Sequence, residues 1–174
     1  RVDDRGFISE QGQWTVTAEK AHAVLTDPSN EYLVVPHTGP NAVYVFGFDP
    51  LTGEMVPNEP AYFQTPPGSG PRHAVFHPHK PIVYTVNEQG GSVTTWRTNF
   101  PMQTLSSIET LSTLPENFSA DNACADLELT PNAKWLFASN RGHNSLACFQ
   151  VDSDNGRLRS VARTATETTP RQFS

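Results

Sequence analysis

The sequence has few signs of α-helix, because no apolar residues recur over a long stretch with the 3.6-residue period of an amphipathic helix. It has no apolar run of membrane-spanning length, so a membrane partner is not indicated. Basic residues are also few: 12 Lys and Arg stand against 18 Asp and Glu, for a formal net charge of −6. A nucleic-acid partner is therefore not expected, because phosphate binding needs a basic surface.

Cysteine is scarce as well. Cys124 and Cys148 are the only two, and neither has the spacing of a metal site or belongs to a motif that pairs Cys with His. We interpret them as free thiols in a reducing compartment, and expect a cytoplasmic protein. No signal-peptide pattern follows Arg1.

Proline and glycine are plentiful by contrast. The chain has 15 Pro and 11 Gly in 174 residues, spaced along the sequence rather than clustered. This spacing is typical of many short strands joined by turns. The length is sufficient to bury a sizeable core as one domain.

A repeat of about 50 residues organises the chain. Its anchoring prolines are Pro28, Pro78 and Pro131, which are 50 and 53 residues apart. An apolar residue in each of the hairpins that follow recurs at the same intervals of 50 and 53 residues. These residues are Val43, Val93 and Leu146. A fourth copy begins at Pro170 and is cut off at Ser174.

Each copy predicts four strands, a to d, separated by turn residues. Strand a is expected at Ala23–Thr26, Ala74–His77 and Leu127–Thr130. Strand b is expected at Tyr32–Pro36, Ile82–Asn87 and Trp135–Asn140. Strand c is expected at Ala42–Phe48, Ser92–Arg97 and Ser145–Val151. Strand d is expected at about Glu54–Gln64, Met102–Ser112 and Arg157–Thr164, with Gln13–Ala18 as the strand d of a preceding copy.

The pattern predicts an all-β fold, a β-propeller of four-stranded antiparallel blades, of which this chain holds about half. A β-sandwich is the main competitor, but it does not require the same turn spacing in three copies. The expected organisation is the last strand of a preceding blade at 1–20, blades at 21–64, 70–112 and 123–165, and the start of a further blade at 170–174.

Chain direction alternates in a four-stranded meander, so the d-to-a crossings and the b-to-c turns lie at one end of the blades, which we call the mouth. One crossing position holds His22, Arg72, Ala125 and Arg171 in successive copies. The next position holds Ala23, His73, Asp126 and Gln172. The b-to-c position holds Thr38, Glu88 and Arg141. Residue types change here from copy to copy while the proline and apolar positions persist, which indicates a functional site on a repetitive scaffold. His77 and His79 fall at the opposite end and are expected to be surface or turn residues.

These residue types suit an anion site that includes a base. Arginine binds carboxylate or phosphate and can stabilise the oxyanion of a lactone carbonyl. Glu88 or His22 is expected to act as general base, with His73, Asp126 and Arg171 contacting substrate. No metal cluster, cofactor or nucleophile elbow is indicated. The chemistry left open is addition of water to a lactone, or a proton shift that opens or closes one.

Several motifs carry a family resemblance over about His22 to Phe173. GPRHAVFHP, VNEQGGSV, LPENFSADNACADLELTPNAKWLFASNRGHNSLACFQVD and TETTPRQF together resemble the seven-bladed β-propeller lactonase family. The family includes propeller-type 6-phosphogluconolactonases and carboxy-cis,cis-muconate cyclases. The resemblance implies hydrolysis of 6-phospho-D-glucono-1,5-lactone to 6-phosphogluconate in the pentose phosphate pathway. The site proposed in the cyclase branch corresponds to His22, Arg72, Glu88 and Arg141. The family has seven blades, whereas this sequence stops inside its fourth copy.

Three functions follow as hypotheses. The first is a metal-independent lactonase in which Arg72 and Arg141 meet the carbonyl and acid groups of a small anionic lactone. The second is a lactonising isomerase of carboxy-cis,cis-muconate, and the third is a non-catalytic interaction platform. Tyr44, Trp96 and Phe149 fall on strand c in core-like positions rather than at the mouth, which favours an enzyme. The remaining blades are the expected partners, and the three blades alone are expected to be inactive.

Overall fold

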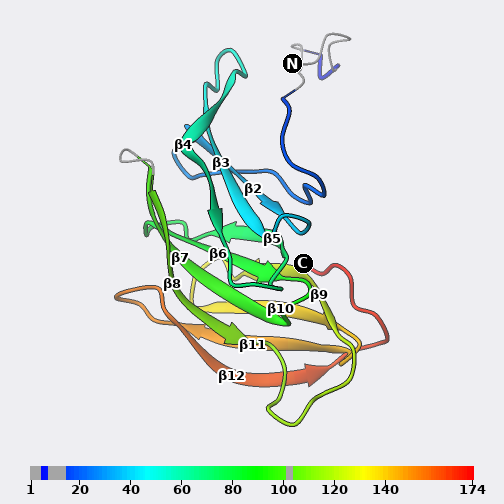
Figure 1. Cartoon of the computed structure of the whole chain (residues 1–174). Coiled ribbons are helices and arrows are strands. Elements are labelled where there is room, and N and C mark those ends of the chain that lie inside the picture. Colours follow the sequence, from blue (N-terminus) through cyan, green and yellow to red (C-terminus); the bar gives the residue numbers. More distant parts are fainter. Residues whose placement is uncertain (1–4, 8–14, 101–103) are drawn as a thin grey trace.

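Three four-stranded antiparallel sheets form the computed structural model, which describes residues 5–7, 15–100 and 104–174 (Figure 1). Blade 1 contains β1 (Leu25–Thr26), β2 (Tyr32–His37), β3 (Ala42–Phe48) and β4 (Met55–Gln64). Blade 2 contains β5 (Pro71–Phe76), β6 (Ile82–Asn87), β7 (Ser92–Asn99) and β8 (Thr104–Ser112). Blade 3 contains β9 (Ala123–Leu129), β10 (Trp135–Arg141), β11 (Ser145–Val151) and β12 (Leu158–Ala165). Strands pair in chain order within each sheet, which confirms the predicted all-β propeller architecture. No helix in the described ranges is long and apolar enough to cross a membrane.

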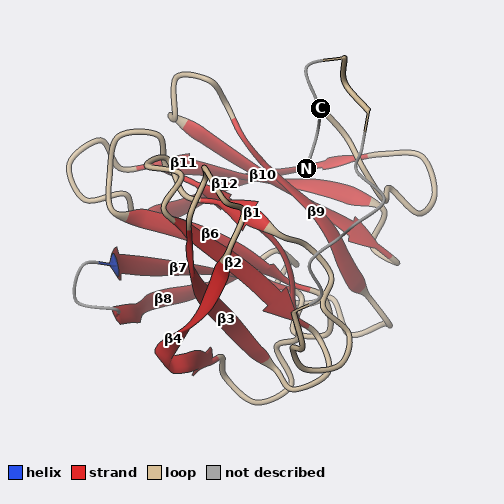
Figure 2. Cartoon of the chain, turned by 90° about the horizontal axis from the view of Figure 1, so that it is seen from above, coloured by secondary structure: helices blue, strands red, loops and turns tan. Residues whose placement is uncertain are grey.

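The blades contact one another mainly through their first two strands, and Figure 2 shows the chain from above. Contacts between sheets involve mainly β2, β5, β6 and β9, and β5 touches β2 on one side and β9 on the other. Apolar side chains fill the two joints. The cluster between blades 1 and 2 includes Val34, Val83 and Trp96. The cluster between blades 2 and 3 includes Tyr84 and Phe149. Burial of these faces against each other is the main stabilising contribution to the blade joints.

The residue before each anchoring proline organises the a-to-b turn. In blade 1 the Asp27 carboxylate accepts hydrogen bonds from the backbone N–H groups of Glu31 and Tyr32, at 3.0 and 2.8 Å. In blade 2 the Nδ1 of His77 accepts from the backbone N–H of His79 at 3.1 Å, and His77 is only 5% exposed. His77 is therefore a turn residue, one of the two alternatives expected for it, and it is buried because its ring replaces the Asp27 carboxylate as turn acceptor.

Strand a differs most from the prediction. In blade 1 only Leu25–Thr26 forms a strand rather than Ala23–Thr26, and Thr15–Ala18 forms none. Gln13 and Trp14, predicted as part of that strand, lie outside the described residues, as do Met102 and Gln103. In blades 2 and 3 the strand begins earlier, at Pro71 and Ala123. Hydrophobic alternation does not extend to these first residues, so the sequence pattern assigned them to the crossing.

Tyr84 offers a test of the joint between blades 2 and 3. It is fully buried, and its hydroxyl donates a 2.7 Å hydrogen bond to the Gly156 carbonyl, which lies in the β11–β12 turn. Tyr84→Phe is expected to lower the free energy of unfolding by about 1–3 kcal/mol, because it leaves a buried carbonyl unpaired. Chemical denaturation measures the loss. Tyr62→Phe is the matched control, since Tyr62 is 49% exposed, and an equal effect in both variants would contradict the assignment.

Candidate functional site

A carboxylate between two guanidinium groups marks the joint of blades 2 and 3 at the mouth. Glu88 follows the last residue of β6, and Arg141 ends β10. The Nη2 of Arg141 lies 2.5 Å from Oε1 of Glu88, and the Nε of Arg72 lies 3.8 Å from Oε2. The Glu88 side chain is 22% exposed and that of Arg141 is 14% exposed, so both reach solvent at the mouth. The structure thus brings together three of the predicted site residues.

Backbone contacts hold Glu88 in place. Its N–H donates to the Gly70 carbonyl at 2.7 Å, and its carbonyl accepts from the Cys124 N–H at 3.0 Å. Arg141 is held in turn, because its Nε donates to the Ala123 carbonyl at 3.2 Å and its Nη2 to the Cys124 carbonyl at 2.9 Å. The ion pair therefore belongs to the joint itself and is ordered by both blades.

Arg72 is a buried residue of β5 rather than part of an open crossing. It is 3% exposed, and its Nη1 donates a 2.6 Å hydrogen bond to the Ala125 carbonyl of blade 3. Its Nε has no hydrogen-bond partner in the described part of the chain. Burial lowers the pKa of Arg72, the facing Glu88 carboxylate opposes this shift, and the charges of Arg141 and Arg171 add to it. The position suits a fixed positive charge behind Glu88 rather than direct contact with a ligand.

His73 and Asp126 form a second pair at the mouth. The Nδ1 of His73 lies 3.0 Å from Oδ1 of Asp126, with side-chain exposures of 30% and 5%. Asp126 is fixed further, because its Oδ2 accepts from the backbone N–H of Phe173 at 3.2 Å. Its own backbone N–H donates to the Ser139 hydroxyl at 3.0 Å. A histidine held by a buried carboxylate in this way has a defined tautomer and ring orientation.

His22 lies beside this pair at the exposed inner edge of blade 1. Its ring centroid is 5.1 Å from that of His73, and its backbone N–H donates to the Pro36 carbonyl at 3.0 Å. Burial, followed by the Arg72 charge, lowers the pKa of both histidines, while the Asp126 carboxylate partly opposes the shift in His73. Both rings are therefore favoured in the neutral form near neutral pH. Arg171, the remaining predicted site residue, is exposed near the C-terminal end, and its charge acts on Arg72.

A polar position inside the blades was not found from the sequence. The residue just before the b-to-c position is polar and fully buried in each blade. It is His37 at the end of β2, Asn87 at the end of β6 and Asn140, the penultimate residue of β10. Asn140 accepts a 2.7 Å hydrogen bond from the Thr113 hydroxyl of blade 2. The recurrence of a polar residue just before the b-to-c position was the available signal. Beside Asn140, burial raises the pKa of the Cys124 thiol to about 11, which does not suit a nucleophile.

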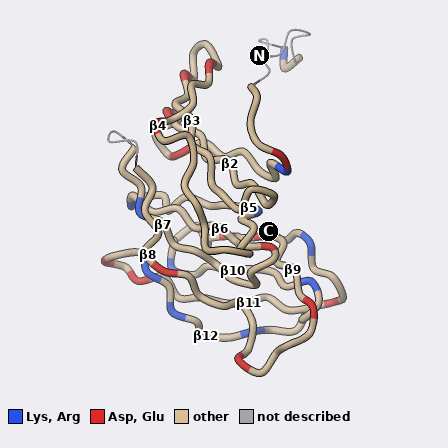
Figure 3. Tube along the Cα trace, viewed as in Figure 1, with Lys and Arg blue, Asp and Glu red and all other residues tan. Residues whose placement is uncertain are grey.

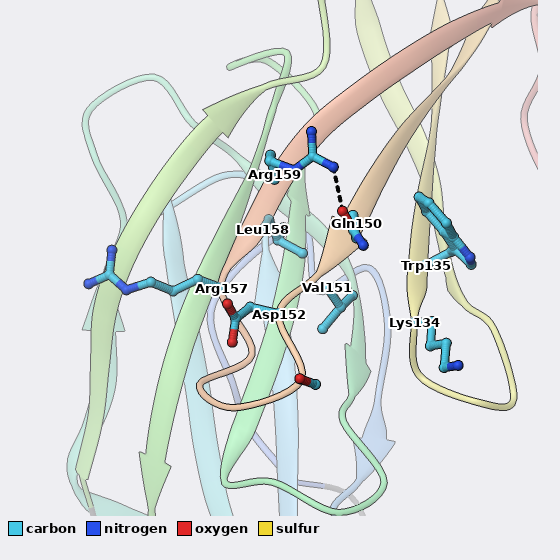
Figure 4. A pocket seen from close by; sticks show the side chains of 9 residues that line it. Lys134, Trp135, Gln150, Val151, Asp152, Arg157, Leu158 and Arg159 are labelled. Carbon is cyan, nitrogen blue, oxygen red and sulfur yellow. Dashed lines mark hydrogen bonds between the residues drawn. The ribbon is translucent and has the colours of Figure 1, made fainter.

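A surface cavity lies elsewhere. It has a volume of about 570 Å³ and lies at the far end of blade 3, where β10 begins and β11 passes into β12 (Figure 4). Lys134, Arg157 and Arg159 line it, and Arg159 donates to the Gln150 side chain. Arg141 ends the strand that Trp135 begins, so this cavity and the charged cluster lie at opposite ends of β10. We place the candidate site at the charged cluster, because the predicted site residues meet there and none of them lines the cavity.

The three blades differ in charge. Blade 1 has only acidic charges, because the sequence has no Lys or Arg between Lys20 and Arg72, whereas blades 2 and 3 have both acidic and basic positions (Figure 3). Among the described residues, no group of three or more His, Cys, Asp or Glu is arranged to hold a metal ion. Within the described residues, the charged groups at the mouth are therefore arginines, a glutamate and a histidine–aspartate pair.

The fold and the site together define a β-propeller with a charged site built across its blade joints. The family model described as "Lactonase, 7-bladed beta-propeller" matches residues 8–174, and the chain belongs to this family. The chain is 35% identical over 156 residues to a 6-phosphogluconolactonase of Cronobacter sakazakii, a match that covers 90% of this chain and 46% of that protein.

The chain is also similar to solved structures of proteins with related descriptions. A periplasmic gluconolactonase of Pseudomonas aeruginosa is similar with a TM-score of 0.82 and 33% identity, over 88% of this chain and 43% of that one. A protein of Bacteroides fragilis described as a putative 6-phosphogluconolactonase has a TM-score of 0.79 and 31% identity, over 88% and 44% of the two chains. The chain thus spans about half the length of the relatives that it matches.

Proposed function

We propose that these three blades belong to a lactone hydrolase that acts on 6-phospho-D-glucono-1,5-lactone and produces 6-phosphogluconate. The working unit in this proposal is the closed propeller, meaning these blades together with the others that complete a ring of seven. The observation that carries the proposal is the cluster of Arg72, Glu88 and Arg141 beside His73 and Asp126 at the mouth. The similarity to a protein named 6-phosphogluconolactonase supports the choice of substrate.

The cluster suits the charges of this reaction. The substrate has a phosphate group, and its carbonyl oxygen becomes negative when water attacks. Arg141 at the joint and the exposed Arg171 supply positive charge for these groups. Arg72 is buried behind Glu88, so in this proposal it holds the carboxylate and orders Arg141 instead of contacting substrate.

A place in the pentose phosphate pathway and a cytoplasmic location belong to the same proposal. The unpaired Cys124 and Cys148 support a reducing compartment. One similar structure is titled a periplasmic gluconolactonase, so cell fractionation of the producing organism is the direct check.

The test is an assay of the closed propeller on three lactones: 6-phosphogluconolactone, glucono-1,5-lactone and carboxymuconolactone. Acid release is followed in a pH-stat and corrected for spontaneous hydrolysis. We expect kcat/KM to be highest for the phosphorylated lactone, because the arginines recognise its second anionic group. A preference for glucono-1,5-lactone would contradict the phosphate assignment. Formation or opening of only the muconolactone would favour the isomerase hypothesis instead.

A further inference from the structure

The inner strands of successive blades place a continuous row of polar groups around the mouth. His22 precedes β1, His73 lies on β5 and Asp126 lies on β9. The His22 and His73 rings are 5.1 Å apart, His73 meets Asp126 at 3.0 Å, and Asp126 accepts from the Phe173 N–H at 3.2 Å. His73 is the central ring of this row, with neighbours in both adjacent blades.

The contacts of Asp126 determine which nitrogen of His73 is free. The carboxylate can only accept at Nδ1, so Nδ1 carries the hydrogen and the lone pair lies on Nε2. Asp126 is 5% exposed at the side chain and is held on both sides, whereas His73 is 30% exposed. His73 therefore combines a fixed tautomer with access to solvent, which a general base requires.

The two other candidates for the base are less suited. Glu88 faces a guanidinium with each of its oxygens, at 2.5 and 3.8 Å, and removing a proton from water requires weakening those pairs. His22 is exposed, and the Glu88 carboxylate acts on it through its charge, whereas His73 has the direct contact with Asp126. Glu88 then keeps the arginines ordered, and His22 flanks the base.

We propose that His73, oriented by Asp126, is the general base that activates water for attack on the lactone. This rests on the proposed lactonase function and identifies its base. Nε2 of His73 removes a proton from water as the water oxygen bonds to the carbonyl carbon, and the carbonyl electron pair moves to its oxygen beside Arg141. When this intermediate collapses, the bond from the carbonyl carbon to the ring oxygen breaks. The proton on Nε2 passes to that oxygen, which leaves the open hydroxy acid.

The charged groups that face His73 set its pH dependence. They are Arg72 on its own strand, Asp126 on β9, Glu88 after β6 and His22 before β1. Burial and then Arg72 lower the pKa of His73, and the Asp126 and Glu88 carboxylates raise it. A protonated His73 cannot accept a proton, so kcat/KM falls as the pH drops through this pKa. Removing the Asp126 charge should lower the pKa of His73 further, and the decrease in kcat/KM should therefore occur at lower pH.

The experiment compares variants of the closed propeller on 6-phosphogluconolactone. His73→Gln is expected to lower kcat by about 10²–10⁴-fold with little change in KM. Asp126→Asn is expected to lower kcat by about 10²-fold or more, because an amide can favour the wrong tautomer, and to shift the acid limb of the kcat/KM profile to lower pH. His22→Gln should lose less activity than His73→Gln.

Matched controls separate the base from a structural role. His79→Gln makes the same substitution on an exposed residue at the other end of blade 2 and should leave turnover unchanged. The inference is overturned if His73→Gln retains near-parental kcat while Glu88→Gln or His22→Gln loses it. It is also overturned if Asp126→Asn leaves the acid limb where it was.

Two measurements on the unmodified protein keep the inference testable if a variant fails to fold. Histidine-selective ¹⁵N labelling should show neutral His73 with hydrogen on Nδ1, and hydrogen on Nε2 would contradict the proposal. The unmodified closed propeller must also hydrolyse at least one of the lactones assayed. If it hydrolyses none, the proposed function fails, whereas activity that survives in His73→Gln overturns only the assignment of the base.

Discussion

Arg141→Ala in the closed propeller is expected to lower kcat by about 10²–10³-fold, the usual effect of removing a donor to a developing oxyanion. Arg141 is the partly exposed member of the two guanidiniums that face Glu88, and the carbonyls of Ala123 and Cys124 fix its direction. The substitution also leaves Glu88 with only the more distant Arg72. Steady-state kinetics on 6-phosphogluconolactone measures the loss, and circular dichroism checks the fold.

Arg163→Ala is the matched control for that experiment. Arg163 lies on β12 and also binds carbonyls of the preceding blade, with Nε 2.8 Å from the Thr113 oxygen and Nη2 2.8 Å from the Leu114 oxygen. Both variants should lose comparable stability, about 1–3 kcal/mol for the unpaired carbonyls, but Arg163→Ala should keep its turnover. Equal kinetic losses would show that Arg141 acts only by joining blades.

The three blades expressed alone, as the 174-residue chain, are expected to associate and to have no lactonase activity. The last blade presents an apolar groove of about 470 Å³ whose lining includes Leu129, Phe137 and Leu146. Val161 on β12 is 45% exposed as well. Surfaces of this kind favour association between chains unless a neighbouring blade covers them.

Size-exclusion chromatography with light scattering measures that association. Leu146→Gln is expected to reduce association of the isolated chain but to destabilise the closed propeller, where we expect the next blade to cover the same position. An isolated chain that is monomeric, unfolds cooperatively and hydrolyses lactone would contradict the expectation.

Regular spacing predicted the middle strands better than the inner ones. Ala42–Phe48, Ile82–Asn87 and Ser145–Val151 have the predicted bounds, because apolar alternation ends at turn residues on both sides. The start of β5 at Pro71 was missed, since its first residues are Pro, Arg and His, and the ladder is shifted between Pro71 and His73. A pattern of apolar residues has no signal for a strand that begins with proline, arginine and histidine.

The arrangement of the site residues could likewise be predicted from the sequence only in part. Glu88 and Arg141 occupy one repeat position in adjacent blades, so their proximity was predictable from the alignment of the copies, and so was that of His73 and Asp126. The burial of Arg72 was not, because it depends on β5 beginning at Pro71 and on the Ala125 carbonyl that receives its Nη1. Which group acts as base likewise depends on side-chain pairing that repeat spacing does not encode.

The separation in sequence of the paired site residues has a consequence for the order of folding. Within a blade each strand pairs with its immediate successor, so a meander can form soon after it is synthesised. Glu88 and Arg141 are 53 residues apart, as are Arg72 and Ala125, and each pair joins two meanders. The mouth should therefore be the last part to become ordered, and its hydrogen-exchange protection should appear only when whole blades dock. Substitutions at these pairs should accelerate undocking more than they slow formation of the individual sheets.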